Sequence, residues 1–279
     1  MMEIVFVADF FVEHILGGGE LNNEEFVKIV SQAGHKVTKL RSFDLTPRHV
    51  RGVSGKFVIA NFMGLSEETK TALEDRAGYV IYEHDHKYLS TRNPADFDDF
   101  VAPDEHIVNR SFYENAMAVF CQSAFHKQIV QKNLPFKNIH NLGGNLWDVE
   151  SLAKMRELSN CEKREACSIM DSPIEHKNTA DALKYCFAKK IPYDLIKDSN
   201  YYSFLAQLGA NKKFVFLPKT PETLSRVVVE ARMMGMQVIT NKLVGATHEP
   251  WFKHKGIDLI EIMEQKRSEI PQKVLRVFE

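Results

Sequence analysis

Short apolar runs rich in β-branched and aromatic residues alternate along the chain with longer segments whose apolar residues recur every three to four positions. The short runs predict buried strands, and the longer segments predict amphipathic helices. In the first half, the predicted strands are 3–8, 35–40, 56–62, 79–84 and 118–123. The predicted helices there cover 23–34, 66–77, 104–116 and 123–133. This alternation predicts a mostly parallel sheet with helices on both faces.

The pattern breaks at 134–150, which is rich in Pro, Gly and Asn, and then restarts. Predicted strands follow at 165–171, 192–197, 213–218 and 237–241, with helices at 178–188, 200–209 and 223–234. We therefore expect an α/β protein with two Rossmann-like domains facing across a cleft. The expected bounds are 1–145 and 146–262, followed by a helical tail, 263–279, that Pro271 interrupts and that either ends the second domain or crosses back to the first. Ligands of such sheets bind beyond the carboxyl ends of the strands.

Composition narrows the classes of protein to consider. The chain is 44% hydrophobic and 26% charged, which is enough apolar material for a globular core. A formal charge of −1 argues against a broad nucleic-acid or anionic-membrane surface. The four cysteines form no CxxC pair, the N-terminus lacks signal-peptide features, and no apolar run approaches the length of a membrane span. The sequence thus predicts a cytoplasmic protein with reduced thiols.

Two glutamates, Glu222 and Glu230, stand near the start of the helix that follows strand 213–218. If that helix begins at Pro221, these glutamates and Arg226 follow one another at helical spacing and form an exposed ladder of charges. The functional interpretation starts from the short turn before the helix. Because the turn places the helix N-terminus at the carboxyl end of the strand, its N–H groups can hold an anion there.

In that interpretation, a phosphate docks on the backbone N–H groups of Thr223, Leu224 and Ser225, beside Glu222. Glu230 lies more than one helical turn further on, where the ribose of a nucleoside would be. A carboxylate suits that place because it accepts hydrogen bonds from two neighbouring hydroxyl groups at once.

The segment PETLSRVVVEARMMGMQVITN, residues 221–241, resembles the E-x7-E segment of retaining GT-B-fold glycosyltransferases of family four, which use nucleotide-sugar donors. Glu222 and Glu230 have the required spacing, and KLVGATHE at 242–249 resembles the small-residue loop that follows in that family. The resemblance implies that Glu222 contacts the donor sugar and that Glu230 binds the ribose hydroxyls.

The first half supplies further candidates through the same resemblance. Gly17, Gly18 and Gly19 correspond to the family's GG-x-E loop, which closes on the donor; the alternative is a flexible turn before a helix. They lack the G-x-G-x-x-G spacing of a dinucleotide site. His84 corresponds to a histidine near the anomeric carbon, with His86 as the second choice and a surface histidine as the alternative for each.

Lys177 corresponds to the lysine of the family's G-R-x-x-x-x-K segment, where it would offset the charge of the donor diphosphate. The usual Gly-Arg is missing, and Asp171 and Ser172 stand where it is expected. Either another cation, Arg92 or Arg110, replaces the arginine, or the donor site is degraded. A solvated lysine at a helix start is the alternative for Lys177.

The resemblance implies an enzyme that moves a hexose-type sugar from a nucleoside-diphosphate sugar to an acceptor hydroxyl with retention of configuration. The acceptor is a glycan, a lipid-linked sugar or another hydroxyl compound. No cofactor other than the donor substrate and no catalytic metal is expected. The alternatives are a non-catalytic nucleotide-sugar-binding module and a sugar-nucleotide epimerase on the same fold.

Overall fold

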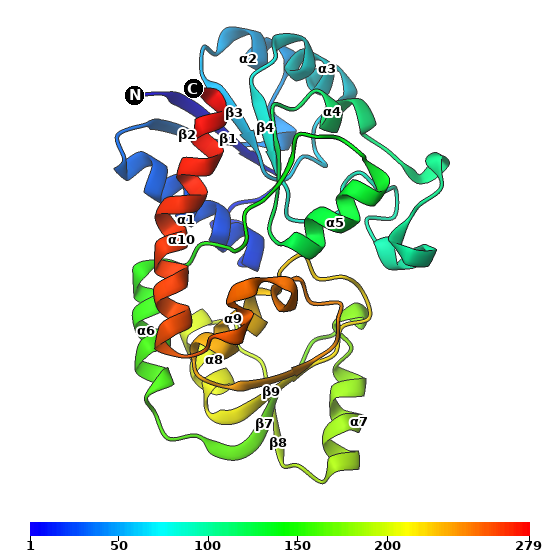
Figure 1. Cartoon of the computed structure of the whole chain (residues 1–279). Helices are drawn as coiled ribbons and strands as arrows, with labels where there is room; N and C mark the ends of the chain where they lie inside the picture. The colour runs from blue at the N-terminus through cyan, green and yellow to red at the C-terminus, as the bar shows by residue number, and fades with distance from the viewer. The chain divides into compact units, whose positions relative to one another are not determined.

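The computed structural model describes all residues, Met1–Glu279, and divides them into two compact units (Figure 1). Unit 1 comprises Met1–Leu146 and Lys266–Glu279, and unit 2 comprises Trp147–Gln265. The second boundary falls inside helix α10 (Ile257–Leu275), which continues through Pro271 instead of being interrupted there. No helix combines the length and apolar composition needed to cross a bilayer.

Unit 1 is built on a six-stranded sheet in the order β2-β1-β3-β4-β5-β6. All neighbouring strands are parallel. The strands are β1 (Glu3–Ala8), β2 (Lys36–Arg41), β3 (Lys56–Ile59), β4 (Tyr79–Tyr82), β5 (Val119–Cys121) and β6 (Ile139–Asn141). β6 lies in the segment for which an irregular joint was expected, because three residues are too few to show a strand pattern in a sequence rich in Pro, Gly and Asn.

Helices cover both faces of this sheet, because successive strand residues point to opposite sides. On one face, the strand residues pack with α2 (Pro47–Gly52), α3 (Glu67–Arg76), α4 (Arg110–Glu114) and α5 (Ala124–Asn133). The other face packs with α1 (Gly18–Gln32) and the C-terminal part of α10. The helix expected over 104–116 is shortened to α4 because Asn109, at its start, has a left-handed φ of 56°.

Unit 2 has a four-stranded parallel sheet in the order β10-β9-β7-β8. The strands are β7 (Arg164–Met170), β8 (Tyr193–Ile196), β9 (Asn211–Phe216) and β10 (Gln237–Thr240). One face packs with α6 (Val149–Ser159), α8 (Tyr201–Gly209), α9 (Arg226–Met233) and the first part of α10, and the other face packs with α7 (Thr179–Lys189). The sequence pattern did not predict α6.

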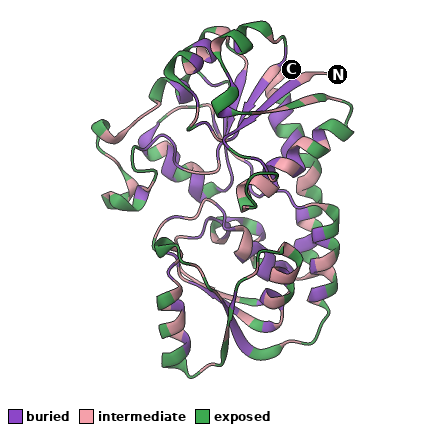
Figure 2. Ribbon diagram, turned by 180° about the vertical axis from the view of Figure 1, so that it is seen from behind, coloured by how far each residue is buried: buried purple, intermediate pink, exposed green.

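Helix α9 begins later than its sequence suggested. Ser225 has φ +71°, a left-handed conformation that a helix cannot include, so the helix starts at Arg226 and not at Pro221. Glu222 therefore lies in the turn before the helix. Buried residues concentrate in the strands and on the helix surfaces that pack against them (Figure 2). Since all strands of each sheet are parallel, their carboxyl ends meet at one edge, and loops at that edge carry most of the candidate residues.

Candidate functional site

Two candidate residues of unit 2 meet although they lie 45 positions apart. The Nζ atom of Lys177, in the turn between β7 and α7, is 2.8 Å from Oε1 of Glu222, in the loop after β9. The same Nζ atom lies 5.8 Å from the centre of the Phe216 ring, at the end of β9. A cation between a carboxylate and an aromatic face is favourably placed for both. The carboxyl edge of this sheet thus carries a partly buried ion pair.

The backbone holds Glu222 in place from both sides. Its N–H group donates to the carbonyl oxygen of Leu243 at 2.7 Å, and its carbonyl oxygen accepts from the N–H of Gly245 at 2.9 Å. Leu243 and Gly245 belong to the small-residue loop that follows β10. Glu222 and Val244 of this loop thus form an isolated parallel β-bridge. The bridge fixes the backbone of Glu222, and with it the position of the side chain beside Lys177.

The turn before α9 contains a buried polar atom with no partner. Ser225 is 8% exposed, and its Oγ atom makes no hydrogen bond. The N–H groups of Val228 and Val229 donate to the Ser225 carbonyl oxygen at 3.1 and 3.3 Å. The first helical N–H groups that can face an anion therefore belong to Arg226 and Val227, a few residues after the amides of Thr223, Leu224 and Ser225 that the sequence indicated.

Glu230 lies inside unit 2, with 2% of the residue exposed. Its Oε1 atom accepts hydrogen bonds from the Trp147 indole N–H at 2.9 Å and the Tyr201 hydroxyl at 2.6 Å. The Arg226 Nε atom is 3.3 Å from the same oxygen, and its guanidinium group lies 4.4 Å above the Trp147 ring. The structure gives Oε2 no partner. The alternative of an exposed ladder of charges is wrong, because Glu222 is outside the helix and Glu230 is buried.

Sequence reasoning missed most of this cluster. Arg226 stands four positions before Glu230, so local spacing does signal their pairing. Tyr201 and Trp147 are 29 and 83 positions away from Glu230, and no local pattern links them to it. Burial, followed by the charge of Glu230, raises the pKa of the Tyr201 hydroxyl, so this group remains a hydrogen-bond donor.

His84 follows β4 in unit 1 and is held by two amides. The Gln122 side-chain N–H donates to its Nδ1 atom, and its Nε2 atom is 2.6 Å from Oδ1 of Asn23. This pairing specifies a neutral ring that carries its proton on Nε2. Burial, followed by the charge of Lys87, lowers the pKa of His84 to about 3. His84 is therefore a neutral hydrogen-bonding group at physiological pH.

His86 has a different environment and is a residue of the core. Its Nδ1 atom is 3.0 Å from the Tyr88 hydroxyl, and its ring meets the His126 ring edge to face at 5.0 Å. Burial lowers the pKa of His86 to about 4. Of the two histidines that the sequence singled out, His86 is almost fully buried and His84 is partly exposed.

A buried ion pair fixes the turn that carries His84. The ammonium group of Lys87 bonds the carboxylate of Glu83, which also accepts a hydrogen bond from the Tyr113 hydroxyl. Both side chains of the ion pair are fully buried. Glu83 further accepts the backbone N–H of Asp85 at 2.8 Å, and burial raises the pKa of Glu83 against the lowering effect of Lys87. Sequence reasoning did not predict this ion pair.

The two arginines considered as replacements for the missing Gly-Arg pair with carboxylates inside unit 1. Arg92 Nε donates to Asp85 at 2.7 Å, and Arg110 donates to Asp104 at 3.2 Å. Burial opposes the ionisation of Asp85, but the charges of Lys87 and Arg92 outweigh it and lower the pKa of Asp85. Each of the two arginines therefore already has a carboxylate counter-charge within unit 1.

The glycine segment of unit 1 is a helix start and not an open loop. Gly18 and Gly19 form the first turn of α1, and Gly17 precedes them with an extended φ of −134°. A methyl group added at Gly19 would lie 4.0 Å from Cγ of His84, so this turn lies against the histidine. Burial raises the pKa of Glu20, the first acidic residue of the helix. The structure thus brings Gly19 next to His84.

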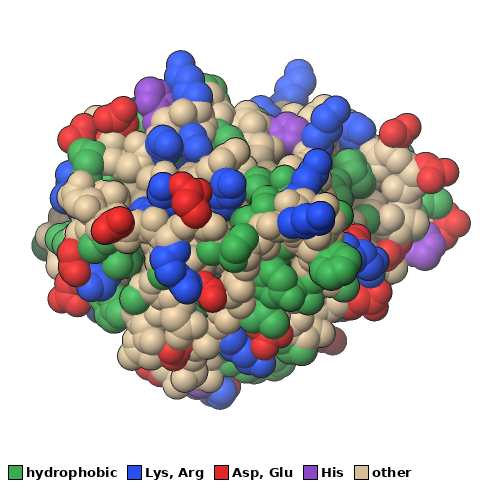
Figure 3. Space-filling model, turned by 90° about the horizontal axis from the view of Figure 1, so that it is seen from below, with side chains coloured by type: hydrophobic (Ala, Val, Ile, Leu, Met, Phe, Trp, Pro, Cys, Tyr) green, Lys and Arg blue, Asp and Glu red, His purple; other side chains and the backbone are tan.

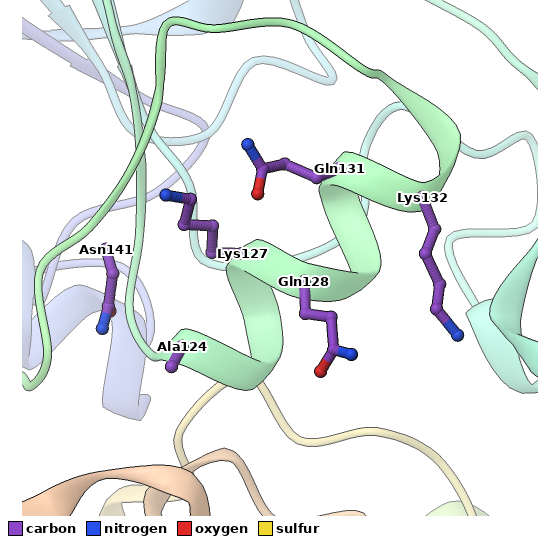
Figure 4. Close-up of a pocket in the computed structure, with 6 residues that line it drawn as sticks. All are labelled: Ala124, Lys127, Gln128, Gln131, Lys132 and Asn141. Carbon is purple, nitrogen blue, oxygen red and sulfur yellow. The ribbon is translucent and has the colours of Figure 1, made fainter.

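A shallow pocket of about 550 Å³ lies along α5. Figure 4 shows Lys127 and Gln131 extending from the helix toward the segment that carries Asn141. Gln128, Lys132 and Ala124 complete the lining. This lining offers amide and ammonium groups, which bind hydroxyl-rich or anionic molecules. No group of three or more His, Cys, Asp or Glu side chains is arranged to hold a metal ion.

No protein-family model and no curated protein sequence matches this chain. Solved structures do match it in three dimensions. HepE of Anabaena, determined with UDP and glucose, has a TM-score of 0.55 at 15% identity, covering 100% of this chain and 96% of HepE. An alpha-glucosyltransferase determined with UDP and a 13-mer DNA has a TM-score of 0.54 at 13% identity, covering 99% and 93%.

The alpha,alpha-trehalose-phosphate synthase (UDP-forming) of Burkholderia vietnamiensis has a TM-score of 0.55 at 8% identity, covering 99% of this chain and 95% of the synthase. At such identities the likeness shows the fold and nothing finer. It extends over nearly the whole length of each protein, so both units take part in it. The expected fold class is confirmed: the chain has the two-domain Rossmann-like architecture of the GT-B glycosyltransferases.

Proposed function

We propose that this protein is a glycosyltransferase that moves a sugar from a nucleoside-diphosphate sugar to an acceptor hydroxyl with retention of configuration. The observation that carries the proposal is the Lys177–Glu222 pair at the carboxyl edge of the unit 2 sheet. The resemblance in sequence selected these two residues independently, and the chain brings their side chains to 2.8 Å. UDP-glucose is the first donor to consider, because HepE has been determined with UDP-glucose.

Lys177 and the start of α9 suit a diphosphate. The ammonium group supplies a point charge, and Ser225 Oγ and the N–H groups at the start of α9 supply hydrogen-bond donors. In the proposed complex, Lys177 turns from Glu222 to the diphosphate, which frees the Glu222 carboxylate for hydroxyl groups of the sugar. The same lysine then stabilises the charge that develops on the departing nucleoside diphosphate.

Glu230 binds the ribose in this proposal through its second carboxylate oxygen. Trp147, Tyr201 and Arg226 all contact Oε1, which fixes the carboxylate plane and leaves Oε2 for a hydroxyl group. Such preorganisation lowers the entropic cost of binding. Glu230 thus has both a structural and a ligand-binding role.

Unit 1 supplies the acceptor side. His84 corresponds to the histidine near the anomeric carbon in the resembled family; because Gln122 and Asn23 already bond both ring nitrogens, a sugar hydroxyl in this proposal takes the place of Asn23 as the partner of Nε2–H. In the reaction, the bond between the anomeric carbon and the diphosphate oxygen breaks, and the acceptor oxygen bonds to that carbon on the same face. The acceptor proton leaves with the nucleoside diphosphate, and this completes the balance without a redox step. The pocket along α5 is a place for the rest of a hydroxyl-rich acceptor.

The test is a panel of nucleotide sugars scored for transfer and for hydrolysis, with UDP-glucose first. Glu222→Gln should abolish transfer while UDP still binds, because the variant loses the sugar contact and keeps the diphosphate site. Glu162→Gln, a change at an exposed glutamate of the same unit, is the control and should retain full activity. Full transfer activity in Glu222→Gln would refute the assignment.

A second candidate is a nucleotide-sugar-binding module without catalysis. It is favoured by Asp171 and Ser172, which stand where the resembled enzymes carry Gly-Arg and leave Lys177 as the only cation of that segment. Binding of UDP-glucose with neither transfer nor hydrolysis for any acceptor would decide for the module.

A further inference from the structure

Asn145, in the loop after β6, is a buried asparagine whose side chain has no partner. The residue is 4% exposed. Its Oδ1 atom is buried and accepts no hydrogen bond, and its Nδ2 atom donates none. An amide that leaves water without gaining a new partner is unfavourable in a folded protein. A polar side chain of this kind therefore requires an explanation.

The fold itself does not use the Asn145 side chain. The nearby helix α6 is capped by Asp148, whose carboxylate accepts the N–H of Ser151 at 2.8 Å. Asn133, a buried asparagine of unit 1, shows what a structural role looks like in this protein. It bonds three backbone groups, at 2.8, 2.8 and 2.9 Å. Asn145 neither caps a helix nor bonds the backbone.

Two hydrogen bonds tie the loop around Asn145 to other segments of unit 1. The N–H of Gly144 donates to the carbonyl oxygen of Gln122 at 2.9 Å. The N–H of Leu146 donates to Oδ1 of Asn22 at 2.8 Å. The residues on both sides of Asn145 are thus fixed to the segment after β5 and to helix α1.

The same two segments hold His84. The Gln122 side-chain N–H donates to Nδ1 of the histidine, and Oδ1 of Asn23 lies 2.6 Å from Nε2. Asn23 is the residue next to Asn22. The loop that carries Asn145 is therefore bonded to both segments that supply the partners of His84, at the carboxyl edge of the unit 1 sheet.

This cluster contains one unused donor and one unused acceptor. Nδ2 of Asn23 is buried without a partner, as is Oδ1 of Asn145. A hydroxyl group both accepts and donates a hydrogen bond, so it can satisfy groups of both kinds. The amides bonded to His84 are uncharged, as is the histidine, which suits a hydroxyl better than a phosphate or a carboxylate. Charged side chains of both signs lie instead on the surface, as on the face drawn in Figure 3.

We propose that Asn145 binds a hydroxyl group of a sugar substrate, a role that rests on the sugar transfer proposed above. The hydroxyl oxygen accepts the Nε2–H of His84 in place of Asn23, and the hydroxyl proton is donated to Oδ1 of Asn145. Nδ2 of Asn23 then serves the oxygen of the same or the neighbouring hydroxyl. The sugar is that of the donor or that of the acceptor, and the two have the same chemistry at this point.

The first experiment compares Asn145→Leu with Asn133→Leu by thermal unfolding of the full chain. Leucine is similar in size to asparagine and has no hydrogen-bonding group. Asn145→Leu should leave the unfolding midpoint unchanged or raise it, because it removes a partnerless amide from the interior. Asn133→Leu, the control, should lower the midpoint by about 4 °C or more, since three backbone groups lose their partner. An equal loss in both variants would show that Asn145 serves the fold and would overturn the proposal.

The second experiment measures hydrolysis and transfer with the donor that the nucleotide-sugar panel identifies. Asn145→Leu should lower kcat/KM by about tenfold, because one hydrogen bond to the sugar is lost. Its affinity for UDP should equal that of the wild type, because UDP lacks the transferred sugar. A loss of hydrolysis without acceptor places the hydroxyl on the donor sugar, and a loss of transfer alone places it on the acceptor.

The outcomes separate this assignment from the proposed function. A wild type that is active, together with an equally active Asn145→Leu variant, refutes the role of Asn145 and leaves glycosyl transfer standing. A wild type that acts on no nucleotide sugar refutes glycosyl transfer and, with it, the sugar hydroxyl assigned to Asn145.

Discussion

The indole N–H of Trp147 donates a hydrogen bond to Oε1 of Glu230 at 2.9 Å, and both side chains are buried. Trp147 is the first residue of unit 2, and Glu230 lies in the middle of α9. This contact ties the start of the unit to its central helix. It also explains how a carboxylate can be buried so deeply, because Tyr201 and Arg226 complete its surroundings.

The first prediction concerns the two roles of Glu230. Glu230→Ala removes the carboxylate that faces the buried Arg226 guanidinium group and should lower the free energy of unfolding by about 3–5 kcal/mol. Glu230→Gln keeps the size and shape of the side chain, so it should lower the free energy of unfolding by less. It should also weaken UDP binding, because a neutral amide replaces the carboxylate that contacts the ribose. Urea denaturation and calorimetric titration with UDP measure the two effects. Unchanged UDP affinity in a folded Glu230→Gln variant would reduce Glu230 to a structural residue.

The second prediction concerns the Lys177–Glu222 pair. Lys177→Met should weaken UDP binding by about 10- to 100-fold, because a charge-assisted contact to the diphosphate is lost. Glu222→Gln should strengthen UDP binding slightly, since Lys177 no longer needs to leave a counter-charge. The control is Lys189→Met, an exposed lysine at the end of α7. Equal UDP affinities for all three variants would contradict the donor-phosphate site.

The third prediction concerns the buried Glu83–Lys87 pair of unit 1. Glu83→Gln leaves the Lys87 ammonium group buried without its counter-charge and should destabilise unit 1 by about 3–5 kcal/mol. The double variant Glu83→Gln/Lys87→Met removes both charges and should recover much of that loss. Urea denaturation of the wild type, Glu83→Gln, Lys87→Met and the double variant gives the coupling free energy. Additive losses in the double variant would show that the two charges do not interact.

The fourth prediction is a pH dependence of stability. Burial lowers the pKa of His86 to about 4 in the folded protein, below the value of 6.5 for an ordinary histidine. The unfolded chain therefore binds the proton more readily, and stability falls as the pH drops below the unfolded value. Between pH 7 and pH 5, this one group should cost about 2 kcal/mol. In His86→Gln, the difference in the free energy of unfolding between pH 7 and pH 5, measured by urea denaturation, should be smaller by that amount. The same difference as in the wild type would contradict this role of His86.

The fifth prediction separates structure from function at Gly19. A methyl group fits there, since the atom that it would meet beyond the backbone of its own helix is His84 Cγ at 4.0 Å. Gly19→Ala should leave stability unchanged or raise it by about 0.4–1 kcal/mol, because the unfolded chain loses freedom. Transfer activity should fall, because the methyl group narrows the space beside His84. Thermal unfolding measures the change in stability, and the transfer assay measures the change in activity. Full activity in Gly19→Ala would show that this turn has no role beyond starting α1.

The candidate site shows which features a local sequence pattern can predict and which it cannot. The spacing of Glu222 and Glu230 and the position of Lys177 after β7 were visible in sequence, because each follows from residues near one another in the chain. Their surroundings were not visible. Trp147 and Tyr201 around Glu230, and Gln122 and Asn23 around His84, come from elements far apart in sequence, and only packing places them.

The order of apolar and polar residues is enough to predict the alternation of strands and helices, and hence two parallel α/β sheets, because burial on both faces of a sheet requires apolar runs that are recognisable in the chain. It did not determine where short elements begin. β6 has three residues, and α9 starts at Arg226 because Ser225 adopts a left-handed conformation. Tertiary structure alone decided which charges are buried, since burial depends on the partners that distant segments supply. Glu230 is the clearest case: its helical spacing fits an exposed ladder, and its partners place it in the core.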